Sequence, residues 1–332
     1  MSSDQPAAAP PTETGPSPDD TLQALDVDDS AYSADSAYTD DDYQSYATSL
    51  SSSARSFKWQ HGRRFHAYRE GAYNFPNDER EQDRLDLFHE LFTMSLGGKL
   101  YLAPVEKIER VLDIGTGTGI WALEVGDQHP SCEVLANDLS PIQPTWVPPN
   151  VLFEVDDCED EWPNRKPFDL IHGRYLAGSI QDWPALLRQC YSQTSKGGWV
   201  ELQDLDLQNY SEDNSISPDN QVLKLYEVLL QGCEKIGRTA SPGTHLRQWV
   251  EAAGFKNVHE RVFKLPVGPW PRDPTMRQIG AMNLAQLLEG LEAFTLGLFT
   301  RVLNWSPDEV QVFLSKVRRD AFKKDVHMIH NL

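Results

Sequence analysis

The stretch that decides the fold is Val111–Gly119, which reads VLDIGTGTG. Its first half is a short apolar run that ends close to Asp113, which is typical of a buried strand. Three glycines at alternate positions follow, and they predict a tight turn into a helix that begins near Ile120. A strand, a glycine turn and a helix in this order are the entry to a nucleotide-binding α/β fold.

The glycine spacing and the place of Asp113 distinguish this turn from a dinucleotide site. A nicotinamide site expects G-x-G-x-x-G, whereas this chain has G-x-G-x-G with a carboxylate two residues before the first glycine. A carboxylate repels a pyrophosphate and attracts an ammonium or another cationic group. The turn therefore favours S-adenosylmethionine (SAM), which has a sulfonium, an ammonium and no phosphate. The alternative is a tight strand-to-helix turn in another α/β protein.

Acidic residues also follow the next two predicted strands. The second strand ends in Asp138, 25 residues after Asp113, where a carboxylate can accept hydrogen bonds from both ribose hydroxyls. The third strand, at 151–155, leads into Asp157 and Cys158, where an acid can accept from the adenine amino group and a backbone N–H can donate to the ring. A single such acid is more often a helix cap or a loop residue. Acids at three successive strand ends favour a cofactor site.

Strands and helices alternate between residues 109 and about 204. This alternation predicts an α/β fold with a doubly wound, mostly parallel, Rossmann-like sheet and with ligands at the carboxyl ends of its strands. The strands are expected at 111–114, 132–138, 151–155, 168–172 and 199–203, with a helix at 183–193 before the last of them. Further on we expect helices at 222–230, 245–253, 276–304 and 307–323, and a strand at 258–265.

Composition divides the chain into three parts. Residues 1–56 hold eleven acids and one base, about half of the formal net charge of −20, and few large aliphatic side chains, which predicts a disordered acidic tail. Residues 57–108 combine aromatic and basic side chains with a helical pattern that Asn77 or Asp78 caps, and they predict a helical lid over the cofactor cleft. We expect residues 109–332 to form the SAM-binding domain, with a helical insertion at about 276–304.

The same composition argues against several classes of protein. The four cysteines are scattered without a C-x-x-C pair, which fits a reducing compartment and disfavours a zinc module, and no metal is expected. No run of 18 apolar residues and no secretory signal are evident, so we expect a cytoplasmic or nuclear protein without a membrane span. The acidic charge disfavours direct binding of nucleic acid.

Several longer segments carry a family resemblance. The chain resembles class I SAM-dependent methyltransferases, and within them the LaeA-type (UMTA-like) fungal methyltransferases, over about residues 57–330. The segments are YNFPNDE at 73–79, the glycine turn, DLSPIQP at 138–144, WVPPN at 146–150, FEVDD at 153–157, AGSIQDW at 177–183, GWVELQ at 198–203 and GPWPRD at 268–273.

The resemblance assigns roles to residues of the expected site. It implies that Asp113, Gly115 and Gly117 line the methionine moiety of SAM, that Asp138 holds the ribose, and that Asp157 and Cys158 hold the adenine. The family also ends in an antiparallel last strand. Because this chain stops at Leu332, where that strand should begin, we expect the strand to be missing and the sheet edge to be unpaired.

The residues after the fourth strand usually face the methyl group in this fold. Here His172 is a candidate general base, with burial within the strand end as an equal alternative. Arg174 is a candidate clamp for an acidic acceptor, although an ion pair with a nearby carboxylate explains it as well. Tyr68, Tyr73, His66 and His245 are weaker pocket candidates.

Two functional hypotheses follow. The first is a SAM-dependent methyltransferase of fungal secondary metabolism that methylates O, N or S of a small molecule, whose pocket the apolar segment 276–304 walls. The second is a LaeA-like nuclear regulator of secondary-metabolite genes that works with a protein partner, with the acidic tail as the contact. A scaffold without turnover is a third alternative, because of the expected missing strand.

Overall fold

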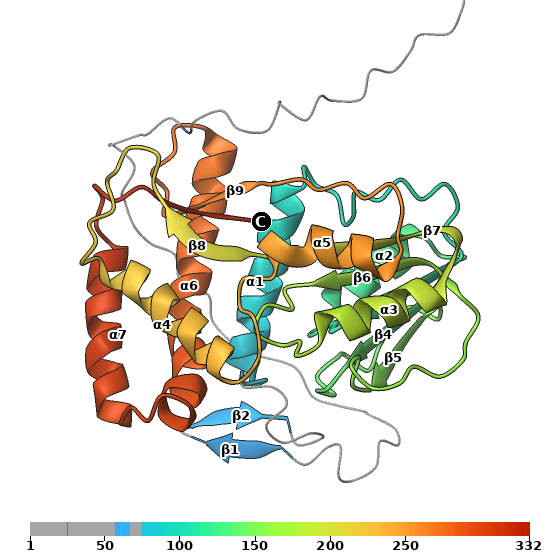
Figure 1. Ribbon diagram of the computed structural model, residues 1–332, viewed down its shortest axis with the longest axis horizontal. Helices are drawn as coiled ribbons and strands as arrows, with labels where there is room; N and C mark the ends of the chain where they lie inside the picture. The colour runs from blue at the N-terminus through green and yellow to red at the C-terminus, as the bar shows by residue number, and fades with distance from the viewer. Residues whose placement is uncertain (1–24, 26–56, 61, 67–74) are drawn as a thin grey trace, which may run out of the picture.

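A five-stranded parallel sheet forms the centre of the computed structural model, which describes residue 25 and residues 57–60, 62–66 and 75–332 (Figure 1). The sheet order is β5-β4-β3-β6-β7, so the chain builds outward from β3 in one direction and then from β6 in the other. The crevice where this order reverses lies between the carboxyl ends of β3 and β6, where such sheets bind ligands. The strands are β3 (Arg110–Ile114), β4 (Glu133–Asp138), β5 (Val151–Val155), β6 (Phe168–Arg174) and β7 (Thr194–Gln203). The predicted fold class is confirmed.

Both faces of this sheet are covered, as the alternation of β3 shows. Val111 packs into a core with Trp121 of α2 (Ile120–Gln128), whereas the next residue, Leu112, packs into a second core with Trp183 of α3 (Trp183–Gln193). Successive side chains of a strand point to opposite faces, so both sets are buried only if helices lie on both sides. α5 (Gly243–Ala253) packs against α3.

A second layer of helices stands beside the sheet (Figure 1). It consists of α4 (Gln221–Lys235), α6 (Pro274–Arg301) and α7 (Pro307–Ala321), which share one apolar core. α6 matches the helix expected at 276–304, and it is buried around most of its circumference. α1 (Glu79–Ser95) runs between this layer and the sheet and packs along α6.

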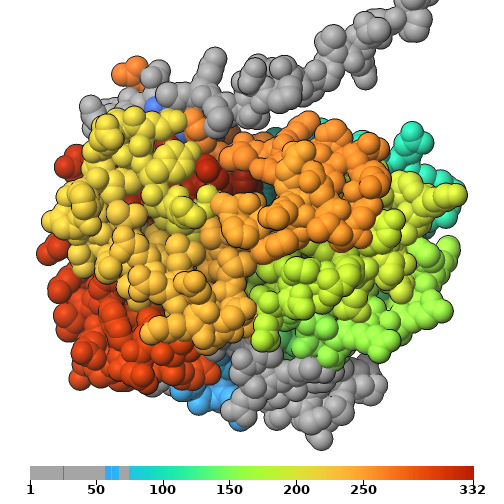
Figure 2. Space-filling view, in the orientation of Figure 1, coloured from blue at the N-terminus to red at the C-terminus, as the bar shows by residue number. Residues whose placement is uncertain are grey.

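An antiparallel last strand is present, so the expectation that it is missing is wrong, but it belongs to a separate three-stranded sheet and does not pair with β7 at the edge of the central sheet. β10 (Met328–Asn331) pairs antiparallel with both β8 (Asp206–Tyr210) and β9 (Lys264–Val267). Figure 2 shows the red C-terminal end of the chain set between the yellow and orange segments. Pairing on both sides, together with the burial of Met328 and Ile329, holds this four-residue strand in place.

The strand expected at 258–265 is also corrected. Only Lys264–Val267 forms β9, because its partner β10 is four residues long and a ladder extends only as far as both strands do. Beyond the ladder, Phe263 and Leu332 still exchange two backbone hydrogen bonds of 2.8 Å.

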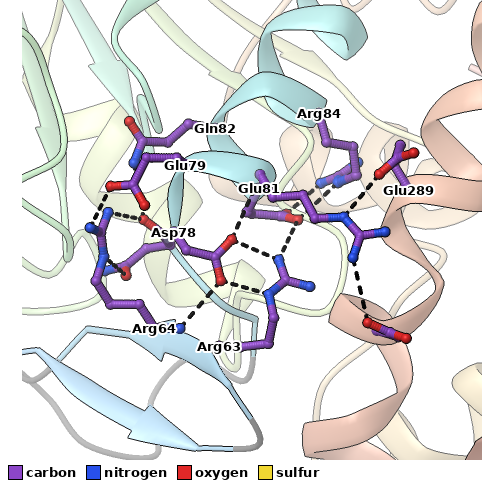
Figure 3. A network of polar contacts seen from close by, with 11 residues as sticks. Arg63, Arg64, Asp78, Glu79, Glu81, Gln82, Arg84 and Glu289 are labelled. Atoms are coloured by element: carbon purple, nitrogen blue, oxygen red, sulfur yellow. Dashed lines mark hydrogen bonds and ion pairs between the residues drawn. The ribbon is translucent and has the colours of Figure 1, made fainter. Parts of the chain in front are cut away.

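A short hairpin and a polar network hold α1 (Figure 3). The hairpin consists of β1 (Lys58–Gln60) and β2 (Arg63–Phe65), which were not predicted. Arg63 donates to both carboxylate oxygens of Asp78, the N-cap of α1, at 2.6 and 2.9 Å. Arg84 pairs with Glu81 within α1 and donates to Gln286 of α6 at 3.1 Å. Both neighbours of α1 are thus tied to it by buried charged groups.

The predicted acidic tail at 1–56 lies outside the described residues, apart from Leu25. Tyr68 and Tyr73 lie outside them as well. Among the described residues, no helix is both long and apolar enough to cross a membrane.

Candidate active site

The glycine turn after β3 needs its glycines. Gly115, Gly117 and Gly119 have φ values of 66°, 61° and 83°, a left-handed region that side chains other than glycine rarely adopt. A Cβ atom at Gly115 would lie 2.5 Å from Cδ2 of Leu176, and one at Gly119 would lie 2.5 Å from Cζ of Phe153. The turn therefore brings bare backbone to the open end of the sheet, and α2 starts directly after it.

A pocket opens at this point, between the carboxyl ends of the strands and α1. Six of the eight residues predicted for the site line it: Gly115, Gly117, Asp138, Asp157, Cys158 and Arg174. α1 adds a mainly apolar wall, and the loop after β6 adds further side chains: Leu85, Phe88, His89, Phe92, Tyr175, Leu176 and Ile180.

Asp138, at the end of β4, is held by the backbone on both sides. Its Oδ2 accepts a hydrogen bond of 2.9 Å from the Gly117 N–H, and its Oδ1 accepts one of 2.8 Å from the Ser140 N–H. Burial raises the pKa of this carboxyl to about 6, although these two donors favour the charged form. Asp138 is thus fixed beside the glycine turn, where its remaining lone pairs can accept from a ligand.

Asp157 and Cys158 follow β5 and line the same pocket. Asp157 accepts a hydrogen bond of 3.0 Å from the N–H of Glu159, which folds the loop back on itself. Burial raises the pKa of the Cys158 thiol well above its usual range, with the charge of Asp157 as a further cause. Cys158 therefore stays a neutral wall residue and is no nucleophile.

The other two predicted residues, Asp113 and His172, lie outside the pocket wall. β3 and β6 run in register, so these residues are neighbours, and the His172 ring nitrogen Nδ1 lies 2.7 Å from Oδ1 of Asp113. The other oxygen of Asp113 accepts from the Thr116 hydroxyl at 2.6 Å. The His172 ring is fully buried and stacks on Trp121 with centroids 3.7 Å apart. The buried pair of Asp113 and His172 thus holds the glycine turn in place through Thr116.

Arg174, at the end of β6, faces the pocket and meets a residue that the sequence interpretation missed. Its Nη2 lies 2.6 Å from Nδ1 of His89 on α1, and its guanidinium stands 5.3 Å from the ring centre of Phe92. On the far side of the imidazole, Nε2 of His89 lies 3.2 Å from Oε2 of Glu124 on α2. Burial, followed by the charge of Arg174, lowers the pKa of His89 to about 3, so its ring is neutral.

Tyr175 is a second pocket residue that was not singled out. It has a φ of 55°, a left-handed value that is uncommon for an aromatic residue and is found at functional sites. Its ring lies edge-on to Phe88 at 4.4 Å. For His89 the sequence did contain a signal, since Phe88, His89 and Phe92 lie close together in the helix that was expected to form the lid. Of the weaker candidates, His66 and His245 do not line the pocket.

The pocket thus has two chemically different ends. Carboxylates gather at the ends of β4 and β5, where they can accept from hydroxyl and amino groups, whereas aromatic rings of α1 and Arg174 line the end near β6. The described residues include no group of three or more His, Cys, Asp or Glu that could hold a metal ion. Such a site can bind a polar cofactor beside an apolar acceptor and hold the two together.

Comparison with known proteins adds the family context. The model of a family described as "Methyltransferase domain" matches residues 68–260. The chain is 50% identical to "Methyltransferase pytC" of Aspergillus terreus over 290 residues, 87% of this chain and 90% of that protein. It is 36% identical to "Secondary metabolism regulator LAE1" of Cochliobolus heterostrophus, over 82% of this chain and 92% of that protein. It is 34% identical to "Protein-methionine methyltransferase laeA" of Emericella nidulans, over 84% of this chain and 75% of that protein.

Proposed function

The chain belongs to the methyltransferase-domain family, and we propose that it is a SAM-dependent methyltransferase of fungal secondary metabolism that methylates O, N or S of a small molecule. One observation carries this proposal. The glycine turn, Asp138 and Asp157 line a single pocket together with aromatic side chains of α1. The acidic strand ends suit the donor, and the apolar wall suits a small, largely apolar acceptor.

The residues present fit the donor. In this proposal Asp138 accepts from the ribose hydroxyls, Asp157 and the backbone at Cys158 hold the adenine, and Gly115 and Gly117 let the backbone approach the methionine part. SAM supplies a methyl group that its sulfonium has already activated. The protein's own task is then to place the acceptor atom in line with that methyl group and to exclude water.

No histidine of the described residues is placed to act as a general base, which favours catalysis by positioning of the acceptor. His89 is the one that lines the pocket, and its Nδ1 is engaged by Arg174. His172 is sealed beneath the turn. We therefore expect an acceptor that is nucleophilic without a histidine base, held by the walls that α1 and the loop after β6 provide. Residues 57–108 act as the lid over that acceptor.

The test combines donor binding with a search for the methylated product. Calorimetric titration of SAM into the full chain should show binding. Incubation with SAM that carries a labelled methyl group and an extract of a fungal strain lacking the gene should then label the small-molecule fraction. No binding of SAM by folded protein would refute the proposal. A heat-denatured sample of the protein is the control for transfer without enzyme.

The regulatory alternative rests on a specific observation, because two of the relatives are named as a regulator and as a protein methyltransferase. In that reading the protein acts in the nucleus with a protein partner, and the acidic tail is a candidate contact. The same labelled reaction separates the two readings, since the label would appear in precipitated protein and not in the small-molecule fraction. A tagged copy that is excluded from the nucleus would count against the regulator.

A further inference from the structure

Arg174 is an unusual pocket residue because of what surrounds it. Its neighbours are the aromatic ring of Phe92 and the neutral imidazole of His89, to which one of its five N–H groups donates. Within residues 57–60, 62–66 and 75–332, no carboxylate lies within ion-pair distance of the guanidinium. Most of its hydrogen-bonding capacity is therefore directed at the pocket.

Two carboxylates, Asp113 and Glu124, act on the guanidinium through space without pairing with it. Asp113 uses one oxygen for His172 and the other for Thr116. Glu124 lies beside Nε2 of His89. Both charges favour the protonated guanidinium through space, while burial lowers the pKa of Arg174 to about 10, so the side chain is a cation at neutral pH. Among the residues that the structure describes, no counterion is in direct contact with this cation.

His89 fixes the direction of this cation. An arginine side chain cannot accept a hydrogen bond, so Nδ1 of His89 must be the acceptor of the 2.6 Å contact. The proton of the neutral ring is then on Nε2, which lies 3.2 Å from Oε2 of Glu124 but makes no hydrogen bond to any described residue. The hydrogen bond to His89 and the stacking over Phe92 therefore hold the guanidinium in one orientation.

A lone cation is unfavourable in a pocket for SAM unless an anionic group joins it. The sulfonium of the donor and Arg174 carry charges of the same sign, and they repel each other. The pocket carboxylates that could offset this charge lie at the ends of β4 and β5, away from the end of β6. A ligand that brings its own carboxylate to the guanidinium removes this repulsion and satisfies the fork of N–H groups in a bidentate pair.

We propose that Arg174, oriented by His89, is a carboxylate clamp in the methyltransferase pocket. The carboxylate belongs either to the methionine part of SAM or to the methyl acceptor, and the chemistry at the guanidinium is the same in both cases. Arg174 is the binding residue, and His89 is a positioning residue that acts through it. This inference rests on the proposed function, because it takes the pocket to be the SAM site.

The first experiment measures whether the donor's carboxylate is recognised. Calorimetry on the full chain compares SAM with decarboxylated SAM, for the native protein and for Arg174→Gln. Charge-assisted hydrogen bonds predict that the native protein prefers SAM by about tenfold or more, and that Arg174→Gln loses this preference. Arg247→Gln is the matched control, since it removes the same charge from an exposed pair with Glu251 on α5.

The second arm tests the acceptor as the source. Benzoate is titrated into the complex of the protein with S-adenosylhomocysteine, again for the native protein and for Arg174→Gln. If the native protein binds benzoate and the variant does not, while the preference for SAM over decarboxylated SAM is unaffected, the clamp serves the acceptor. If Arg174→Gln changes neither measurement, the clamp does not exist, although the proposed function stands. If folded native protein does not bind SAM, the proposed function fails and the clamp falls with it.

His89 has its own test. His89→Leu removes the acceptor for Arg174 and should reduce the carboxylate discrimination seen in whichever arm responds, whereas the amide oxygen of His89→Asn can accept from the guanidinium and should restore much of it. A purely structural role would lower the melting temperature and leave the discrimination unchanged. Equal discrimination in the native protein and in folded His89→Leu would overturn the positioning role.

Discussion

Gly119 and Gly117 belong to one turn with similar backbone angles, yet a methyl group would meet different surroundings at each. At Gly119 the added Cβ would lie 2.5 Å from the Phe153 ring, whereas at Gly117 its nearest neighbour would be Cδ1 of Leu85 at 3.7 Å. Both alanine variants incur the left-handed backbone cost of about 1–2 kcal/mol. Only Gly119→Ala adds steric overlap in packed surroundings, which costs about 1–3 kcal/mol. We expect losses in the free energy of unfolding of about 2–5 kcal/mol for Gly119→Ala and about 1–2 kcal/mol for Gly117→Ala.

The effect on ligand binding should run the opposite way. Gly117 and Leu85 both line the pocket, so a methyl group at Gly117 that points toward Leu85 occupies ligand space. We expect Gly117→Ala to weaken SAM binding by about tenfold or more, equivalent to about 1.4 kcal/mol. Urea unfolding gives the stability of each variant, and calorimetry below both melting temperatures gives the affinity. Equal stability losses in the two variants would refute the steric reasoning, and unchanged affinity in Gly117→Ala would refute the placement of the ligand.

Two further predictions concern buried charges. Burial raises the pKa of Asp204 to about 7, above an unfolded value of about 3.9, so its contribution to stability is present below about pH 4 and is lost as pH rises through 7. Asp204→Asn should remove this part of the pH dependence of the free energy of unfolding, measured in urea. The same dependence on pH in the native protein and in Asp204→Asn would contradict the prediction. Arg84→Met leaves buried Glu81 without its main partner and should lower the free energy of unfolding by about 3–5 kcal/mol. Adding Glu81→Leu should recover much of that loss, and a double variant as unstable as Arg84→Met would argue otherwise.

The strands of the central sheet could be predicted because each has a local sequence pattern of its own. The apolar runs before Asp113 and Asp138 are long enough to predict strands, and glycine or acidic residues indicate where each strand ends. β10 could not be predicted in this way. Met328–Asn331 is too short for a pattern, and it is a strand only because β8 and β9 flank it on both sides.

The site was predictable only in part, for a related reason. Residues at strand ends, such as Asp138 and Arg174, reach the pocket because of the topology, which the alternation of strands and helices already implies. The contact between Arg174 and His89 joins positions 85 residues apart and depends on how α1 crosses the sheet, which no local pattern specifies. The contact between Asp113 and His172 depends on the register of β3 with β6, and a shift of β6 by one residue would turn His172 to the other face of the sheet.

The two halves of the pocket are fixed by different kinds of interaction, and this has a consequence for specificity. The acids that suit the donor follow strands of the sheet, where backbone ladders hold them. The apolar wall comes from α1, which side-chain contacts attach to its neighbours, among them the link from Arg84 to Gln286 on α6. Substitutions along α1 and α6 can therefore reshape the acceptor space without moving Asp138 or the glycine turn. If the proposed function is right, one donor site can in this way be combined with acceptor walls of different shape.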